Sequence, residues 1–213
     1  FPPASPFTAA LGSVCALTAS YTLGPCYFNP DDYREDISDG QLGVPVILAL
    51  RLVDSQCNPM AGADVDIWHC NAEGLYSGDS SDSSDASSFN TGFCTDNDAS
   101  ALAGRWFRGI QTTDSDGIVY FKTCFPGWYP GRTTHIHFQI RYNNRQSLVS
   151  QFCFDDTLSN DIYLSHSDYS GQAKDTLNSR DNVFDSDYAD YQFATARNDD
   201  GSMLAWKTIQ ISG

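Results

Sequence analysis

Basic residues are scarce in this chain: 12 lysines and arginines face 27 aspartates and glutamates, which leaves a net charge of −15. A field of that sign repels phosphate backbones and anionic lipid headgroups, so we expect neither nucleic acid nor a membrane surface as a partner. Long apolar runs are missing as well, and the longest, VPVILAL from Val44 to Leu50, has only the length of a strand. We therefore expect no membrane span.

The cysteines lack any CxxC pair, the spacing typical of zinc ribbons and thioredoxin-like sites. The chain has seven of them, at Cys15, Cys26, Cys57, Cys70, Cys94, Cys124 and Cys153. Their scatter favours disulfides, and the odd number leaves one thiol free, bonded to another chain or bonded to something outside this sequence. Asn-x-Ser/Thr sequons are absent too, so glycosylation gives no indication of the compartment.

Helical periodicity is weak, with at most short turns between Asp155 and Gly171. A chain of 213 residues with 41% hydrophobic and 13% aromatic residues can still build one substantial core. Strand-like stretches occur at residues 42–53, 63–70, 105–113, 118–125, 134–142, 147–154 and 203–211. We therefore predict an all-β fold, a β-sandwich of mainly antiparallel strands with long loops and few short helices.

Two parts are expected along the chain. Residues 1–30, rich in proline and small side chains, predict an N-terminal arm packed on the body, and residues 31–213 predict a single sandwich domain. The acidic, aromatic stretch from Asp181 to Asn198 is expected to run over the surface. Residues Asp79 to Ser88, DSSDSSDASS, predict a solvated loop, with a calcium site as the alternative although EF-hand spacing is absent.

The stretch THIHFQIRY, residues 134–142, predicts half of a metal site. In a strand, His135 and His137 point to one face while Ile136 and Phe138 point to the other. Histidines two apart have Cα atoms roughly 6.5 Å apart, so both imidazoles can reach one ion at about 2.1 Å. The alternative is an ordinary amphipathic strand with its polar face in water.

The neighbourhood of that strand carries a family resemblance. Tyr129 and Arg132 precede it on a loop rich in proline and glycine, and Tyr76 follows the strand ADVDIWHC. The segments WHCNAEGLYSG and FPGWYPGRTTHIHF resemble the intradiol ring-cleaving catechol dioxygenases, which have a tyrosine after a W-x-x-N-x-x-G-x-Y turn, a second in a P-G-x-Y-P turn, and an R-x-x-H-x-H run. The likeness extends upstream through LGPCYFNPDDYREDISDG and downstream to VSQFCF, from Gly24 to Phe154.

The resemblance implies a non-haem Fe(III) enzyme that opens the ring of a catechol between its two hydroxyl-bearing carbons with O2, giving a muconate-type diacid. Hard phenolate donors favour ferric over ferrous iron, which makes sense of the paired tyrosines. By resemblance, Tyr129 leaves the iron when substrate binds, Arg132 stabilises negative charge on the activated ring, and Gln151 lies near the substrate. The implied iron ligands are Tyr76, Tyr129, His135 and His137.

One departure concerns the loop between the second tyrosine and the arginine. Only Pro130 and Gly131 separate Tyr129 from Arg132, whereas many members of the family have a longer loop there. This compact WYPGR form resembles the secreted branch and predicts a shorter, more open rim over the metal. The cysteine content and the opening FPPASPF, which lacks an initial methionine, agree with an exported mature chain, so we expect an extracellular protein.

Two other readings compete with this one. A non-catalytic β-sandwich module for binding or adhesion could keep the fold without turnover. A copper or zinc site in another oxidoreductase could use the two histidines, but it would not explain the paired tyrosines. The sequence indicates neither the natural catechol nor the oligomeric state.

Overall fold

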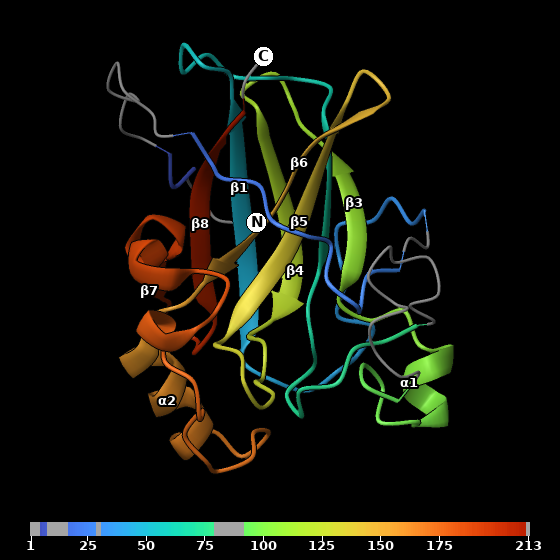
Figure 1. The fold of residues 1–213 in the computed structure, drawn as a ribbon, viewed down its shortest axis with the longest axis vertical. Helices are drawn as coiled ribbons and strands as arrows, with labels where there is room; N and C mark the ends of the chain where they lie inside the picture. The colour runs from blue at the N-terminus through green and yellow to red at the C-terminus, as the bar shows by residue number, and fades with distance from the viewer. Residues whose placement is uncertain (1–4, 8–16, 29–30, 79–91, 212–213) are drawn as a thin grey trace.

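The computed structural model describes residues 5–7, 17–28, 31–78 and 92–211. Within these residues, eight strands form two four-stranded sheets that pack face to face (Figure 1). The predicted all-β sandwich with few short helices is confirmed. The Ser/Asp stretch at 79–88, with its calcium alternative, lies outside the described residues.

The first sheet has the order β4-β1-β8-β7. Its strands are β1 (Pro45–Val53), β4 (Ile118–Cys124), β7 (Ala194–Arg197) and β8 (Met203–Gln210). β1 lies between β4 and β8, and its pairing with β8 is parallel, from Val46 opposite Met203 to Val53 opposite Gln210. The other pairings in this sheet are antiparallel.

The second sheet has the order β3-β2-β5-β6 and is antiparallel throughout. Its strands are β2 (Asp64–Trp68), β3 (Arg108–Thr112), β5 (His135–Tyr142) and β6 (Arg145–Cys153). β5 is a central strand, so its backbone is fixed on both sides. His137 lies opposite Trp68 on β2 and opposite Gln151 on β6, which places the predicted metal half-site in the most constrained part of the sheet.

The alternation of β5 places its apolar residues in the core between the sheets. Ile136, Phe138 and Ile140 are buried there with Leu48, Phe121 and their neighbours. The opposite face of β5 is buried as well, contrary to the idea that it lies in water. Residues of the N-terminal arm cover it: the Tyr21 N–H donates to the Val149 carbonyl, and Cys26 and Tyr27 belong to a second apolar cluster on that side.

Two helices lie at the same end of the sandwich, on opposite sides of it in Figure 1. They are α1 (Ala99–Ala103) and α2 (Asp156–Ser165). The prediction of at most short turns after Asp155 was wrong for α2. Asp155 caps that helix by accepting the Leu158 N–H, and Ile162 and Tyr163 anchor it in the core, so a cap and two buried side chains suffice without strong periodicity. No helix among the described residues is long and apolar enough to cross a membrane.

The stretch Asp181 to Asn198 is not the surface excursion we expected. It follows η3 (Asn178–Arg180) and contains η4 (Asp185–Tyr191) and β7, and its aromatic residues Phe184, Tyr191 and Phe193 are buried in the main core. The acidic residues between these aromatics hid the pattern, because neither a period of two nor a period of 3.6 results.

The cysteines divide between disulfides and buried thiols. Cys26 and Cys94 form a disulfide, and Cys57 is disulfide-bonded too. The expectation of one leftover thiol was wrong, because Cys70, Cys124 and Cys153 are free and buried. These three behave as small apolar side chains, a common use of cysteine in protein interiors.

Candidate metal centre

Two tight turns carry the two tyrosines, and they lock against each other. Gly74, in the first turn, has a φ of +85°, and a Cβ added there would lie 2.3 Å from the Trp128 carbonyl oxygen in the second turn. A Cβ on Gly127 would lie 2.5 Å from the Asn71 carbonyl oxygen, which accepts the Gly127 N–H. Only glycine permits these approaches. The glycines of both motifs thus hold Tyr76 and Tyr129 at a fixed separation.

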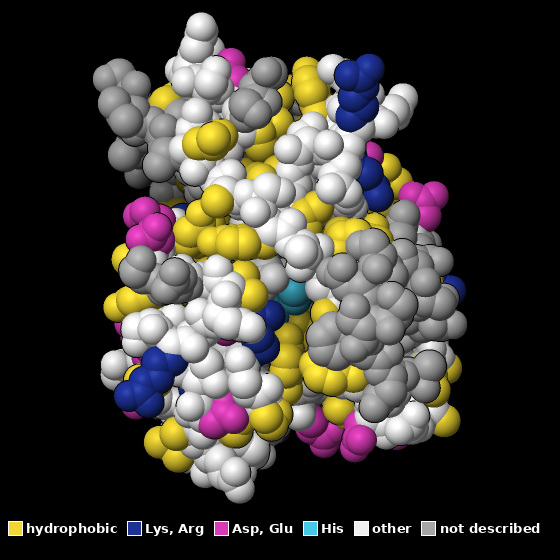
Figure 2. Space-filling model, viewed as in Figure 1, with side chains coloured by type: hydrophobic (Ala, Val, Ile, Leu, Met, Phe, Trp, Pro, Cys, Tyr) yellow, Lys and Arg dark blue, Asp and Glu magenta, His cyan; other side chains and the backbone are white. Residues whose placement is uncertain are grey.

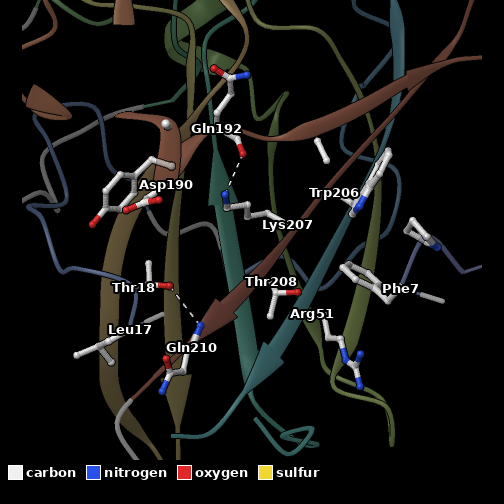
Figure 3. A pocket seen from close by; sticks show the side chains of 14 residues that line it. Phe7, Leu17, Thr18, Arg51, Asp190, Gln192, Trp206, Lys207, Thr208 and Gln210 are labelled. Atoms are coloured by element: carbon white, nitrogen blue, oxygen red, sulfur yellow. Dashed lines mark hydrogen bonds between the residues drawn. The ribbon is translucent and has the colours of Figure 1, made fainter. Parts of the chain in front are cut away.

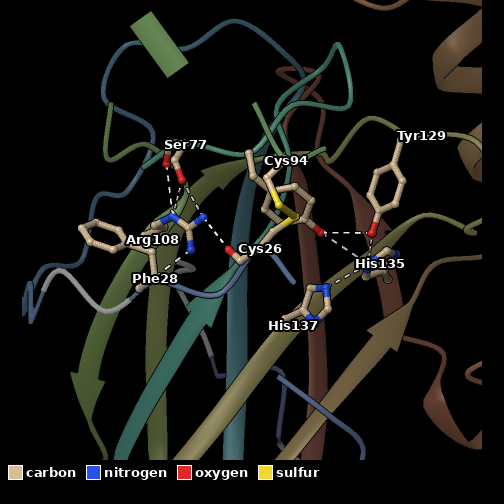
Figure 4. Close-up of a disulfide and its surroundings, with 9 residues drawn as sticks. Cys26, Phe28, Ser77, Cys94, Arg108, Tyr129, His135 and His137 are labelled. Carbon is tan, nitrogen blue, oxygen red and sulfur yellow. Dashed lines mark hydrogen bonds between the residues drawn. A yellow bond between two sulfur atoms is a disulfide. The ribbon is translucent and has the colours of Figure 1, made fainter. Parts of the chain in front are cut away.

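Four donor atoms converge where these turns meet β5 (Figure 4). The Tyr76 and Tyr129 hydroxyl oxygens lie 3.5 Å apart, and they lie 3.4 and 3.2 Å from Nε2 of His135. Nε2 of His137 lies 3.1 Å from Nε2 of His135. The structure therefore brings together all four side chains that the sequence pattern singled out.

The hydrogen bonds of His135 fix which of its nitrogens faces the cluster with a lone pair. Nδ1 lies 2.6 Å from the Thr133 carbonyl oxygen, which can only accept, so Nδ1 carries the proton. Nε2 of the neutral ring then carries the lone pair, and it faces the tyrosine hydroxyls. Nδ1 of His137 is buried without a hydrogen-bond partner among the described residues, and this ring stacks on Trp68 at a centroid distance of 5.1 Å.

Burial keeps the four groups uncharged when no cation is present. Desolvation lowers the pKa of His135 and of His137 well below the usual value, and the positive charges of neighbouring groups add to the effect. Desolvation also raises the pKa of Tyr76 well above 10 and that of Tyr129 to about 12. Only a bound cation would supply the charge that makes phenolates stable here, since coordination deprotonates such ligands.

The arrangement fits a metal ion. Donor atoms 3.1 to 3.5 Å apart are spaced like ligands that share one ion at about 2.0–2.1 Å. Two phenol oxygens and two imidazole nitrogens form a mixed hard and borderline set that suits a trivalent iron ion. The described residues contain no group of three or more His, Cys, Asp or Glu that could hold a metal, which is expected where half the ligands are tyrosines.

Arg132 and Gln151, the predicted second pair of site residues, contact each other. Nη2 of Arg132 donates to Oε1 of Gln151 at 2.5 Å, and Gln151 lies opposite His137 in the β5–β6 ladder. The guanidinium is mostly buried, and its positive charge lowers the pKa of Tyr129 against the larger effect of desolvation. The structure therefore places both predicted residues beside the cluster.

Arg108 is a residue near the site that sequence reasoning missed. It is 1% exposed and donates to the carbonyl oxygens of Ser77 and Cys26, while its guanidinium carbon lies 6.0 Å from the Tyr76 ring centre (Figure 4). The signal in the sequence was an arginine that directly follows two aromatic residues, Trp106 and Phe107. Burial lowers its pKa to about 10, so it stays cationic at neutral pH and fixes the backbone that follows Tyr76.

The cluster is reachable from solvent on one side. A space-filling view shows a histidine side chain at the bottom of a hollow near the middle of the face shown in Figure 1, beside Lys or Arg side chains (Figure 2). A hollow of about 470 Å³ borders Tyr129 and Pro130, and Phe93 and Asp96 form part of its wall. A hollow large enough for a catechol ring therefore adjoins Tyr129.

Another cavity, of about 500 Å³, lies away from the cluster, between the N-terminal arm and strand β8 (Figure 3). Arg51, Trp206, Thr208 and Gln210 form part of its wall. None of the metal-ligating candidates lines it, so its size alone does not make it the reaction site.

The comparisons with known proteins agree with the fold. A family model described as Dioxygenase matches residues 23–196. Catechol 1,2-dioxygenase of Candida albicans is 25% identical over 158 residues, which are 63% of this chain and 46% of that protein. A solved intradiol ring-cleavage dioxygenase from Tetranychus urticae superposes with a TM-score of 0.78 at 28% identity, over 93% of this chain and 95% of that one.

A β-sandwich in which two tyrosines and two histidines converge beside the central strand β5 is an arrangement that fits a metal-dependent enzyme. The chain belongs to the intradiol ring-cleaving dioxygenase family, whose members use non-haem iron. It spans less than half the length of the curated relatives that it matches, catechol 1,2-dioxygenase and the Pseudomonas putida chlorocatechol 1,2-dioxygenase.

Proposed function

We propose that this protein is an active Fe(III) intradiol dioxygenase that converts a catechol and O2 into a muconate-type diacid. The convergence of the Tyr76, Tyr129, His135 and His137 donor atoms carries the proposal. Fe(III) would supply a Lewis acid and a template that holds both catechol oxygens and makes the ring reactive toward O2. Both oxygen atoms enter the product, so catechol plus O2 balances as one diacid.

The protein's own residues have separate tasks in this scheme. Tyr76 is 2% exposed and Tyr129 lies at the rim of the hollow, so Tyr129 would be the ligand nearer to an entering catechol. The Tyr129 oxygen would be able to hold a catechol proton, because burial raises the pKa of this phenol to about 12. Tyr76, His135 and His137 would hold the iron together with it.

Arg132 and Gln151 act on the substrate side. A fixed guanidinium stabilises negative charge that develops on the ring, a task that needs no reorganisation during the reaction. Gln151 holds the Nη2 edge of Arg132 in place, which leaves Nη1 for the substrate.

The compartment is part of the proposal. The Cys26–Cys94 disulfide supports an oxidising environment, and we infer that the enzyme acts outside the cell. The acidic surface favours neutral catechols over catechol carboxylates at long range.

The test is the colour of the iron-loaded protein. Tyrosinate-to-iron charge transfer should give a broad visible band that shifts when catechol is added anaerobically. We expect Tyr76→Phe and His137→Ala to lose iron and the band. Tyr33→Phe alters an exposed phenol whose hydroxyl donates to Asp64 and not to the cluster, so this variant should keep both.

The competing reading is a binding module without turnover. A colourless protein with one iron per chain would overturn the tyrosinate assignment. A coloured protein that consumes no O2 with any catechol would favour the binding module. Product analysis by mass spectrometry, with both atoms of ¹⁸O2 in the diacid, distinguishes intradiol cleavage from simple oxidation of the catechol.

A further inference from the structure

We propose that Asp181 is the positioning residue for Arg132, and that the segment 174–181 forms an outer layer that holds the loop between Tyr129 and His135. This inference rests on the proposed function, because Arg132 acts on the catechol. The sequence assigned no role to this part of the chain, and no metal or substrate candidate lies in it.

Asp181 meets Arg132 as a buried ion pair. Its Oδ2 accepts from Nε of Arg132 at 2.9 Å, and the Asp181 side chain is fully buried. The same oxygen accepts the Thr133 N–H at 2.8 Å, and Oδ1 accepts the Val183 N–H at 2.9 Å. A carboxylate with three N–H donors cannot turn, so it is a fixed anchor for the guanidinium.

These contacts determine which edge of Arg132 remains for a substrate. Nε is occupied by Asp181 and Nη2 by Gln151, while Nη1 makes no hydrogen bond to any residue within 5–7, 17–28, 31–78 and 92–211. Two fixed edges leave the planar guanidinium no freedom to rotate. The negative charge of Asp181 also offsets the positive charge of Arg132, so the site presents directed N–H donors with little net charge.

Thr133 connects the same segment to His135. Its hydroxyl donates to Oδ1 of Asn178 at 2.6 Å and accepts from Nζ of Lys174 at 2.5 Å. Its carbonyl oxygen is the acceptor that fixes the His135 ring. Partners of a metal-ligating histidine commonly set its orientation and basicity, and Thr133 has that place here.

The Lys174 end of the layer is tied to the body of the protein. Lys174 is 5% exposed, and its Nζ pairs with Asp156 at 2.5 Å. The Asn178 side chain donates to the Phe154 carbonyl at 2.8 Å, and its backbone N–H donates to Asp156. The layer therefore couples the start of α2 to the loop before β5, and a change at Asp181 should act on Arg132 first.

The first test compares turnover of two substrates by Asp181→Asn. The variant keeps the size of the side chain but removes its charge and one acceptor. We expect kcat for catechol to fall about 10- to 100-fold, since small misplacements of a catalytic group cost that much. We also expect the ratio of kcat/KM for 3,4-dihydroxybenzoate to that for catechol to rise several-fold, because the Arg132 charge is no longer offset. The control Asp161→Asn removes the same charge from an exposed position on α2.

If Asp181 had a purely structural role, kcat/KM would fall equally for both substrates and their ratio would stay unchanged. That result would overturn the proposal. The same follows if Asp181→Asn behaves like Asp161→Asn. The iron content and the charge-transfer band should be unchanged in both variants, because neither alters a ligand.

The second test needs neither iron nor activity. In metal-free protein, an Arg Nε–H held by a buried carboxylate should give a resolved, slowly exchanging ¹H–¹⁵N NMR signal, assigned by its loss in Arg132→Lys. Asp181→Asn should move this signal and speed its exchange by at least 10-fold. An unchanged signal would overturn the inference even in an active enzyme, whereas an inactive wild type with the expected shift would count against the proposed function alone.

Discussion

At the scale of single residues, hydrogen bonds to specific neighbours fix the orientation of buried polar side chains in this protein. His69, one residue after β2, is a buried histidine outside the metal cluster. Its Nδ1 donates to the Cys70 carbonyl, its Nε2 accepts from the Thr123 hydroxyl, and its ring stacks on Phe107. Both nitrogens are satisfied in the neutral ring, so this histidine has nothing left for a metal.

His69 should make the stability of the protein depend on pH. Burial lowers its pKa from 6.5 to about 4, so the unfolded chain takes up the proton first as the pH falls. The stabilisation is complete above pH 6.5 and is lost between there and pH 4, amounting to about 2 kcal/mol between pH 7 and pH 5. Urea unfolding of the metal-free protein should show a drop that is larger by this amount than in His69→Gln.

The other histidines are the same in both proteins, so their contributions to the two drops cancel. The difference between the two drops therefore isolates His69. Equal drops would mean that this imidazole is charged in the folded protein.

At the scale of elements, the Cys26–Cys94 disulfide joins the N-terminal arm to the loop before α1, and this loop is hydrogen-bonded to the backbone of Tyr76. The Tyr76 N–H donates to the Cys94 carbonyl, and Arg108 donates to the Cys26 carbonyl. Both halves of the disulfide are thus connected to the backbone around Tyr76. The arm covers the histidine face of β5 because this link holds it there.

Replacing both Cys26 and Cys94 by alanine should destabilise the protein and loosen the metal. The bridge spans 68 residues, for which loop closure gives about 4 kcal/mol, and native bridges typically contribute about 2–4 kcal/mol. We expect a loss in that range in urea unfolding, and faster transfer of iron to a chelator. Cys124→Ala, which removes a buried thiol without breaking a bridge, serves as the control. An unchanged rate of iron transfer to the chelator in the double variant would show that the arm does not stabilise the metal site.

At the scale of the whole molecule, the charge of −15 should act on substrates before they reach Arg132. Raising the salt concentration from about 10 to 150 mM shortens the Debye length from about 30 to 8 Å and screens long-range repulsion. We expect kcat/KM for 3,4-dihydroxybenzoate to rise with salt and that for neutral catechol to stay constant. A fall for the carboxylate would show that attraction near Arg132 outweighs the surface field.

Much of this fold could be predicted from the sequence, because its strands carry local patterns. β5 alternates apolar and polar residues, and the ranges of β1, β2 and β4 follow from apolar runs and turn signals. The site was predictable only through the joint occurrence of Tyr76, Tyr129 and the histidine pair, since no local pattern shows that two turns fifty residues apart interlock.

The parts that escaped prediction depend on tertiary partners. Arg108 is buried because three carbonyl oxygens from distant segments face it, and Asp181 because Arg132 does. β7 is short and mostly exposed, and it is a strand because β8 pairs with it. The burial of β5 on both faces also required the arm, whose covering position no periodicity indicates.

The parallel pairing of β1 with β8 has a consequence for how the chain is made. Strands β2, β3, β5 and β6 all lie within residues 64–153, so the sheet that carries the histidines can assemble before β8 is synthesised. β1 emerges before all of them, but its neighbour β8 is made about 150 residues later. Pairing between segments so far apart in the chain is slow, because the long loop between them must close first. Until residues 203–210 leave the ribosome, β1 keeps an open apolar edge of the kind that associates with other chains. The sheet that carries the metal site can thus fold while the β1 edge remains open to association, until β8 pairs with it.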